Sequence, residues 1–336
     1  MKEHKNTSQQ TDLIFHLGYD KCASSTLQDS VFPQTKGYLG AGLNTPLKHK
    51  FAKTFQALAP CGPSIVGSIK QARIWAEQVY NIKQSEFPEV NRLILSSEFY
   101  IMNNIFKTRP IIPFLKKIND QVWHHGEIKI IVIIRNQAEK LASLYAQSSI
   151  ANPNASQADF EKFCVGDVRR FYENMNYSKC IEELHEAFGK DKVCVLLMED
   201  IGKIEFWEKL KQFSDLVEFN PKDMVKGEKV NQRKLNKNTW KLQDYNNDVR
   251  AKYKVNNYFK FFWPAFIAPK PRQKAFEFSK SILKKFYTDK KSKSAQNEEQ
   301  IYLSDEVKST IQKHYKVSNQ KLHEILGRDL TSLGYL

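Results

Sequence analysis

Residues 18–26 read GYDKCASST and separate two patterns that belong to different secondary structures. The preceding residues 13–17, LIFHL, are apolar enough to form a central strand of a parallel sheet. Leu27 and Val31 then recur at helical spacing, which predicts a helix over 24–32. The free N–H groups and the positive dipole end at a helix N-terminus favour an anion. We therefore expect a phosphate-binding turn between this strand and this helix.

The order of the polar residues in this turn distinguishes two families of phosphate loops. A nucleotide triphosphatase loop reads G-x-x-x-x-G-K-[ST], but here Lys21 comes three residues before Ser24 and no second glycine follows. The turn resembles the 5′-phosphosulfate loop K-x-G-T-T-x-L of the sulfotransferases that use 3′-phosphoadenosine-5′-phosphosulfate (PAPS), with Ala23 at the usual glycine. The resemblance implies that Lys21 neutralises charge on the leaving phosphate oxygen. It also implies that the cofactor-binding residues of the turn are Lys21, Cys22, Ala23, Ser24, Ser25 and Thr26. From this turn alone, a plain capped helix is the alternative.

A second segment, residues 130–135 (IIVIIR), is an apolar run that predicts a strand covered on both faces. It ends in Arg135, and Ser143 follows eight residues later on a predicted helix. This spacing resembles the 3′-phosphate site R-x-P-x-x-R-x-x-S of the same family, with Gln137 replacing the proline and Lys140 the second arginine. The resemblance implies that Arg135 and Ser143 grip the 3′-phosphate and so distinguish PAPS from ATP. A solvated strand end is the alternative for Arg135.

A basic, loop-like stretch over 219–238 contains three further candidates, Asn231, Arg233 and Lys234. They lie where the family often places an additional contact to the 3′-phosphate or the adenine. The resemblance therefore adds them to the expected cofactor site. Charged residues of a surface loop are the alternative.

Residues 93–98 (LILSSE) predict another strand, which ends in Glu98. Active-site residues of open α/β sheets gather at the carboxyl ends of the parallel strands, so we expect Glu98 at the same edge as the two phosphate segments. Its position resembles the S-E ending of many bacterial sulfotransferases, which implies that Glu98 is the general base. A capping or salt-bridged glutamate is the alternative. His16, His124 and His125 are weaker candidates, because the first belongs to a strand and the others precede one at the opposite edge.

Further stretches complete an alternating pattern. Residues 193–200 resemble the family's fourth strand, and residues 314–336 resemble its closing helix and G-Y terminus. We predict helices over 24–32, 48–59, 67–84, 110–121, 137–150, 158–188 and 203–213, and strands around 13–17, 37–40, 93–96, 130–134 and 193–197. This alternation predicts an α/β fold with a central parallel sheet, and the resemblance implies a three-layer, P-loop-like core. We expect a polar tail over 1–12 and a single domain over 13–336, with an unmatched insertion at about 245–295.

Composition narrows the class of protein. Of 336 residues, 41% are hydrophobic and 26% charged, which is typical of a soluble globular chain. The first twelve residues lack the apolar core of a signal peptide or membrane anchor. The five cysteines form no C-x-x-C pair, and no His/Cys cluster has the spacing of a metal site. We therefore expect a cytoplasmic protein that uses no metal.

The formal charge of +15 implies attraction to anions. Residues 249–293 contain thirteen Lys and Arg against two acidic residues, so this stretch supplies +11 of the total. Within it, residues 258–267 (YFKFFWPAFI) are strongly aromatic. Aromatic side chains beside lysines suit a membrane interface, a glycan platform or nucleic-acid stacking. A helical segment packed on the core with a solvated basic face is the alternative.

Taken together, these segments resemble the bacterial, carbohydrate-type sulfotransferases. The resemblance implies sulfuryl transfer from PAPS to a hydroxyl acceptor. The basic segment favours a glycan or lipid-linked glycan as acceptor and peripheral contact with an anionic membrane through residues 250–293, and we expect no nucleic-acid partner. Two rival functions stay open. A P-loop kinase would be stabilised by ATP rather than PAPS, and a non-enzymatic polyanion-binding protein would bind DNA with strong salt dependence.

Overall fold

A computed structural model of the chain describes residues 10–39, 69–97, 111–165, 175–226, 234–236, 238–244 and 299–336. The chain divides into two compact units. The first unit comprises Met1–Asn136, Arg169–Val230 and His314–Leu336, and the second comprises Gln137–Val168 and Asn231–Lys313. The single domain expected over 13–336 stays a prediction. The expected insertion at about 245–295 lies outside the described residues.

The first unit is built on a four-stranded parallel sheet in the order β2-β1-β3-β4. The strands are β1 (Asp12–Leu17), β2 (Arg92–Ser97), β3 (Ile128–Ile134) and β4 (Val193–Leu197). Nearly every residue of β1, β3 and β4 is buried, as expected for apolar strands that are covered on both faces. The predicted α/β fold with a central parallel sheet is confirmed.

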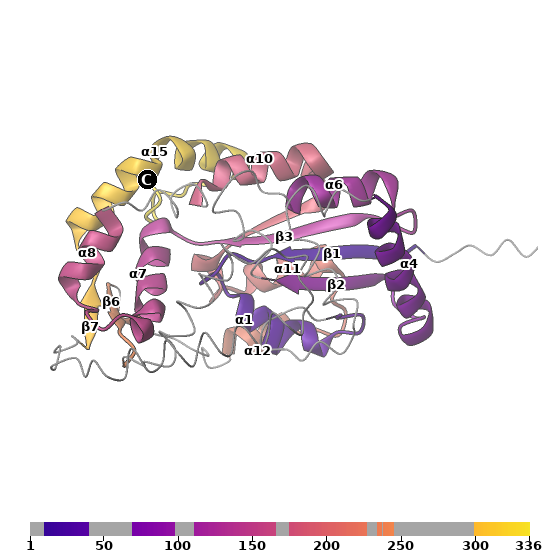
Figure 1. Cartoon of the computed structure of the whole chain (residues 1–336), viewed down its shortest axis with the longest axis horizontal. Coiled ribbons are helices and arrows are strands. Elements are labelled where there is room, and N and C mark those ends of the chain that lie inside the picture. The colour runs from indigo at the N-terminus through magenta and orange to yellow at the C-terminus, as the bar shows by residue number, and fades with distance from the viewer. Residues whose placement is uncertain are drawn as a thin grey trace, which may run out of the picture. The chain divides into compact units, whose positions relative to one another are not determined.

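Helical segments connect these strands and cover the sheet. They are α1 (Ser24–Thr26), η1 (Leu27–Val31), η2 (Phe32–Gln34), α4 (Ile69–Glu86), α6 (Ile111–Gln121), α10 (Tyr177–Phe188), η5 (Lys190–Lys192), η6 (Met198–Asp200), α11 (Ile204–Ser214) and α12 (Pro221–Lys226). Figure 1 shows α6 and α10 along one face of the sheet and α1 on the opposite face. The long helix α15 (Asp305–Leu326) carries the chain from the second unit back into the first.

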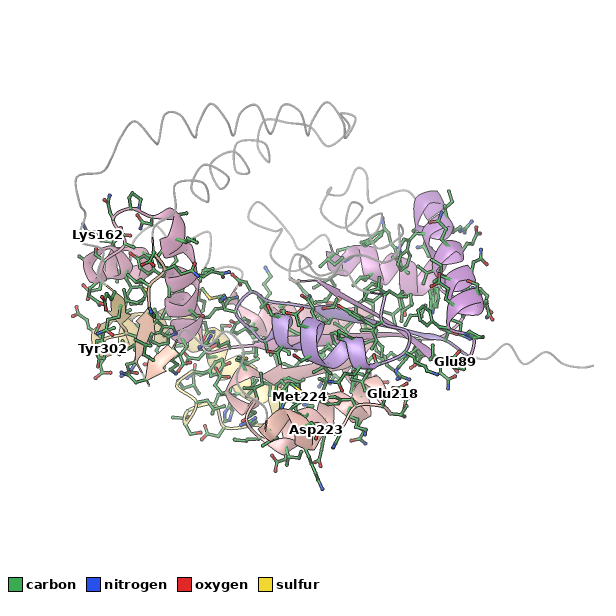
Figure 2. The ribbon with its side chains drawn as sticks, turned by 90° about the horizontal axis from the view of Figure 1, so that it is seen from below. Glu89, Lys162, Glu218, Asp223, Met224 and Tyr302 are labelled. Carbon is green, nitrogen blue, oxygen red and sulfur yellow. The ribbon has the colours of Figure 1, made fainter. Side chains whose placement is uncertain are left out.

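Within the described residues, the second unit contains two helices, the start of α15 and a small antiparallel sheet. Its helical segments are α7 (Gln137–Ser148), η3 (Ser149–Ala151) and α8 (Gln157–Val165), and its strands are β5 (Lys234–Asn236), β6 (Thr239–Lys241) and β7 (Gln300–Tyr302), in the order β5-β6-β7. The side-chain amide of Gln157 binds the backbone of β7 as a neighbouring strand would. Its Oε1 accepts from the Tyr302 N–H at 2.7 Å, and its Nε2 donates to the Tyr302 carbonyl at 2.9 Å. Figure 2 shows Lys162 of α8 and Tyr302 of β7 in this unit.

Three predicted elements differ from the structure. The single helix predicted over 158–188 is wrong, because α8 ends at Val165 and α10 begins at Tyr177. Asn176 caps α10 with a non-helical ψ of 79° and a side chain that accepts from the Lys179 N–H. The helix predicted over 24–32 is one α turn followed by the π-helical turn η1. The strand predicted around 37–40 is a single parallel bridge from Tyr38 to Ile94. The helix predicted over 48–59 lies outside the described residues.

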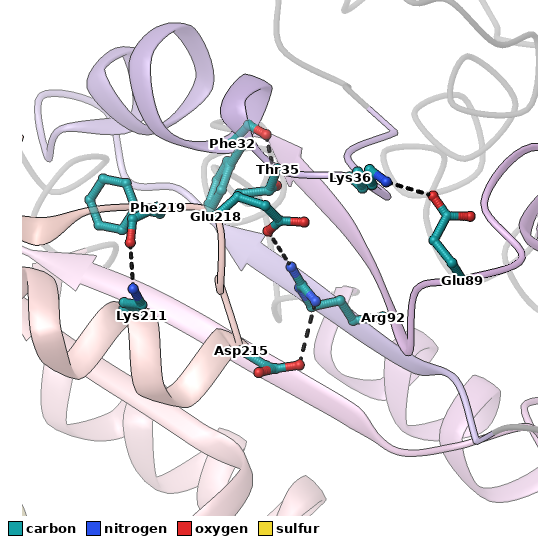
Figure 3. Close-up of polar contacts among 9 residues, drawn as sticks. All are labelled: Phe32, Thr35, Lys36, Glu89, Arg92, Lys211, Asp215, Glu218 and Phe219. Atoms are coloured by element: carbon teal, nitrogen blue, oxygen red, sulfur yellow. Dashed lines mark hydrogen bonds and ion pairs between the residues drawn. The ribbon is translucent and has the colours of Figure 1, made fainter.

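An arginine is buried at the start of β2. The Arg92 side chain is only 5% exposed, and its guanidinium lies 3.4 Å from Asp215 Oδ2 and 3.0 Å from Glu218 Oε2 (Figure 3). Both carboxylates follow α11 in the chain. A buried cation needs such compensation, so this cluster fixes the segment after α11 against the amino end of β2.

Replacing both partners, Asp215→Asn with Glu218→Gln, should destabilise the fold by about 2 kcal/mol, because Arg92 stays buried without a counter-charge. Asparagine suits position 215, whose φ is 50°. Glu89→Gln is the matched control: the Lys36–Glu89 pair is 3.1 Å long, but its side chains are 62% and 52% exposed. Its loss should cost much less stability than the double replacement, because solvent screens this exposed pair. Chemical denaturation measures both, and equal stabilities would contradict the role of the cluster.

Candidate functional site

The turn after β1 has an unusual backbone. Lys21 has a φ of 60° and Ala23 a φ of 61°, both in the left-handed region. An L-residue pays about 1–2 kcal/mol for this conformation, and such residues concentrate at functional sites. Ala23 therefore has the conformation that suits the glycine of the resembled loop. A left-handed Ala23 followed by the helical Ser24 is the kind of turn backbone whose successive N–H groups can bind an anion.

The side chains of this turn differ in their exposure to solvent. Cys22 is completely buried, so its thiol is not exposed at the surface of the turn, and its predicted role at the cofactor stays a prediction. Ser24 is also buried, and its hydroxyl donates to the Tyr19 carbonyl at 3.1 Å. The Ser24 hydroxyl therefore already donates its proton within the turn. Its backbone N–H is the donor that Ser24 could offer to a phosphate. Ser25 and Thr26 are partly exposed.

The structure brings the Arg135 side chain to the backbone of Lys21. Arg135 directly follows β3, which is the neighbour of β1 in the sheet. Its Nη1 donates to the Lys21 carbonyl at 3.4 Å, and both side chains are partly exposed. Because β1 and β3 are parallel, both residues lie at the carboxyl edge of the sheet, where open α/β sheets bind ligands.

The second unit holds two of the other candidates. Ser143 lies in α7 and is 7% exposed. Lys234 begins β5, and its Nζ lies 2.6 Å from Glu139 Oε1 and 5.4 Å from the centre of the Trp240 ring. Lys234 thus has an anionic partner of its own within this unit. Its predicted role at a phosphate, and that of Ser143, stay predictions.

Three candidates fall outside the described residues, namely Glu98, Asn231 and Arg233. For Glu98 the structure supplies only the preceding residue, Ser97, which is the last residue of β2. The predictions for these three residues rest on the sequence.

The histidines are poorly suited to act as the base. His16 is buried in β1, and burial lowers its pKa to about 3. Its Nδ1 lies 2.8 Å from the hydroxyl of Ser96, which also accepts from Gln28 Nε2 at 2.9 Å. The carbonyl of His125 accepts from the Thr11 N–H, next to the start of β1, so this histidine lies at the opposite edge of the sheet. Its ring stacks on Tyr80, and burial lowers its pKa.

Two residues that the sequence did not assign to the site, Asn136 and Tyr335 of the G-Y terminus, also lie at the carboxyl edge. The Asn136 N–H donates to Glu199 Oε1 at 2.6 Å, and the Tyr335 hydroxyl donates to Glu199 Oε2 at 3.2 Å. A polar residue directly after Arg135 was the available signal for Asn136. The G-Y resemblance covered Tyr335 but did not indicate its place at this edge, because its partner Glu199 is distant in the sequence.

A membrane-spanning helix and a metal site each have requirements with which the described residues can be compared. Among their helices, none combines the length and the apolar character needed to cross a bilayer. Across the same part of the chain, no three His, Cys, Asp or Glu side chains gather closely enough to hold a metal ion.

Comparison with known proteins gives structural likenesses only. No family model matches the sequence, and neither does any curated protein. Among solved structures, the chain is similar to a sulfotransferase from Alicyclobacillus acidocaldarius, with 12% identity over 95% of this chain and 97% of that one and a TM-score of 0.48. It is also similar to retinol dehydratase in complex with androsterone and the inactive cofactor PAP, with 11% identity, coverages of 84% and 81%, and a TM-score of 0.32. The function proposed below therefore rests on the residues of this chain.

Proposed function

We propose that this chain is a sulfotransferase that moves a sulfuryl group from PAPS to a hydroxyl acceptor. The observation that carries the proposal is the turn after β1. Lys21 and Ala23 there have left-handed backbones, and Arg135 donates to the Lys21 carbonyl. Concave N–H groups and two cations at the carboxyl edge of a parallel sheet suit a ligand with phosphates. The order of residues, with lysine ahead of the hydroxyls, favours PAPS over ATP.

The residues of the turn fit the 5′ end of this cosubstrate. Bound PAPS would supply a sulfuryl group joined to a phosphate that can leave. The N–H groups that follow Ala23, with the hydroxyls of Ser25 and Thr26, hold the 5′-phosphate. Lys21 stabilises the negative charge that grows on the leaving oxygen. These donors are fixed before reaction by the turn itself, so little reorganisation is needed during transfer.

Two other groups complete the proposed chemistry. Glu98 accepts the proton of the acceptor hydroxyl as the sulfur–oxygen bond forms. Arg135 and Ser143 bind the 3′-phosphate, which ATP lacks, and Asn231, Arg233 and Lys234 add further contacts to the nucleotide. As in phosphoryl transfer, the rate would come mainly from in-line positioning and charge stabilisation.

We propose a glycan or a lipid-linked glycan as the acceptor. The support is the basic, aromatic stretch over 249–293, which carries +11 of the formal charge and suits an anionic or membrane-bound sugar. A cytoplasmic enzyme that contacts the inner face of a membrane through this stretch fits that acceptor.

The test is transfer of label from sulfur-labelled PAPS to a panel of bacterial glycan and glycolipid extracts. The proposal predicts a labelled product from PAPS and none from γ-labelled ATP. Incorporation from ATP alone would make the protein a kinase. Salt-sensitive DNA binding that is unaffected by PAP, with no transfer from either donor, would favour the polyanion-binding protein.

A further inference from the structure

The end of the chain, residues 327–336, folds back onto the carboxyl edge of the sheet and is called here the C-terminal hook. It begins where α15 ends, with Gly327 at a φ of 60°. Arg328 then binds both carboxylate oxygens of Asp200, with Nη2 2.9 Å from Oδ1. The hydrogen bond to Arg328 lowers the pKa of Asp200, so the pair is ionic. Asp200 ends η6, directly after β4, and this pair fixes the start of the hook there.

The middle of the hook is held by the residue that follows Arg135. The side chain of Asn136 donates to the carbonyls of Leu333 at 3.3 Å and Gly334 at 2.5 Å. Gly334 has a φ of 77°, and a Cβ there would lie 3.2 Å from Asn136 Nδ2, so glycine allows this close approach. Asn136 is buried, so breaking these hydrogen bonds would leave its amide without a partner away from water, which is costly.

The last contact of the hook passes through a shared carboxylate. Tyr335 is completely buried, and its carbonyl accepts from Asn319 Nδ2 at 2.8 Å. One oxygen of Glu199 accepts the Tyr335 hydroxyl and the other accepts the backbone N–H of Asn136. Burial raises the pKa of Tyr335 well above its usual value, and Glu199 adds to this rise, so the phenol stays a donor. The positive charge of Arg135 acts in the opposite direction and lowers the pKa of Tyr335.

These contacts form one connected path inside the first unit. It runs from Tyr335 through Glu199 to the Asn136 backbone, and Arg135 then reaches the Lys21 carbonyl. We propose that Tyr335 and Glu199 are positioning residues, which hold the backbone that carries Arg135 and so set the selectivity for the 3′-phosphate. This inference rests on the proposed function, since it assigns Arg135 to that phosphate.

The test compares the dissociation constants of 3′-phosphoadenosine-5′-phosphate (PAP) and 5′-AMP, which lacks the 3′-phosphate, by isothermal titration calorimetry. Tyr335→Phe removes one hydroxyl and keeps the buried ring. We expect PAP to bind about tenfold more weakly, as for loss of one hydrogen bond to a charged group, with AMP affinity unchanged. Glu199→Ala should lower the PAP preference at least as much. Tyr302→Phe, at a tyrosine that is 48% exposed, is the matched control and should change neither affinity.

The outcomes separate this inference from the proposed function. If the wild type binds PAP no better than AMP, the proposed function fails and the inference fails with it. If the wild type prefers PAP and both variants keep the same preference, only the inference is wrong. A parallel loss of both affinities would also overturn it, because a merely structural role predicts that result. Should Tyr335→Phe not fold, Glu199→Ala decides between the same outcomes.

Discussion

Replacing Glu98 with glutamine is expected to lower turnover by about 10²- to 10⁴-fold, the usual contribution of a general base. The amide keeps the size of the side chain but cannot accept the hydroxyl proton of the acceptor. PAP affinity should stay at the wild-type value, because the nucleotide is held by the turn that follows β1. The measurement pairs kcat for labelled PAPS with a PAP titration of the same variant.

Glu89→Gln is the matched control for this substitution. Glu89 precedes β2 whereas Glu98 follows it, so the two glutamates bracket the same strand, and Glu89 is half-exposed in its pair with Lys36. Its turnover should match the wild type. Turnover of Glu98→Gln within about threefold of the wild type would mean that the base lies elsewhere. His16 would be a poor replacement, because burial keeps it neutral with a pKa of about 3.

The second large effect is a loss of stability in acid that is caused by His16. Its pKa is about 3 in the folded protein against an ordinary value of 6.5. Between these values the unfolded chain binds up to one more proton than the folded protein, so stability falls as the pH falls through this window. The slope from this one residue approaches about 1.4 kcal/mol per pH unit, and it vanishes above pH about 6.5.

His16→Asn tests this slope, because it removes the titrating imidazole and keeps a polar group at the same position. The asparagine amide can replace the Nδ1 contact to the Ser96 hydroxyl, which is 2.8 Å long in the wild type, but it does not titrate. Urea denaturation at several pH values from 4 to 7 gives the free energy of unfolding against pH. Its slope should show that the variant takes up about one proton fewer on unfolding than the wild type. Identical pH slopes for the two proteins would show that His16 is not the group that responds.

The sheet could be predicted because each of its strands has a strong local signal. Residues 13–17, 93–96, 130–134 and 193–197 are short apolar runs, and strands buried on both faces need such sequences. The position of the site follows from them, since polar residues directly after parallel strands share one edge. This is why the sequence alone predicts Lys21 and Arg135 at the same edge of the sheet.

Other features depend on contacts that no local pattern encodes. The strands that the structure describes in the second unit have three residues each, too few for a period-two pattern, and β7 lies far along the chain from β6. Asn176 caps the start of α10, and Gly166 directly follows the end of α8. Both residue types favour helix ends, so the single helix predicted over 158–188 missed two local signals. The left-handed backbone of Ala23 contradicts the usual preference of alanine, and only the resemblance to a glycine-containing loop pointed to it.

The C-terminal hook is the clearest case of such long-range specification. Its sequence suggested a closing helix and turn, with a structural role. The hydrogen bonds from Asn136 to the Leu333 and Gly334 carbonyls span almost two hundred positions, with |i−j| of 197 and 198. Residues this far apart in the sequence meet because the sheet topology brings the strand ends and the end of the chain to one edge.

The central claim, that the chain binds a nucleotide through a 3′-phosphate, is tested most directly by thermal denaturation of the wild type with PAP and with 5′-AMP. At a hundredfold excess over its dissociation constant, PAP should add about 2.7 kcal/mol of stability and raise the Tm. The same concentration of 5′-AMP should raise the Tm far less, because it offers nothing to Arg135. Equal shifts with the two nucleotides, or a larger shift with ATP than with PAP, would contradict the account.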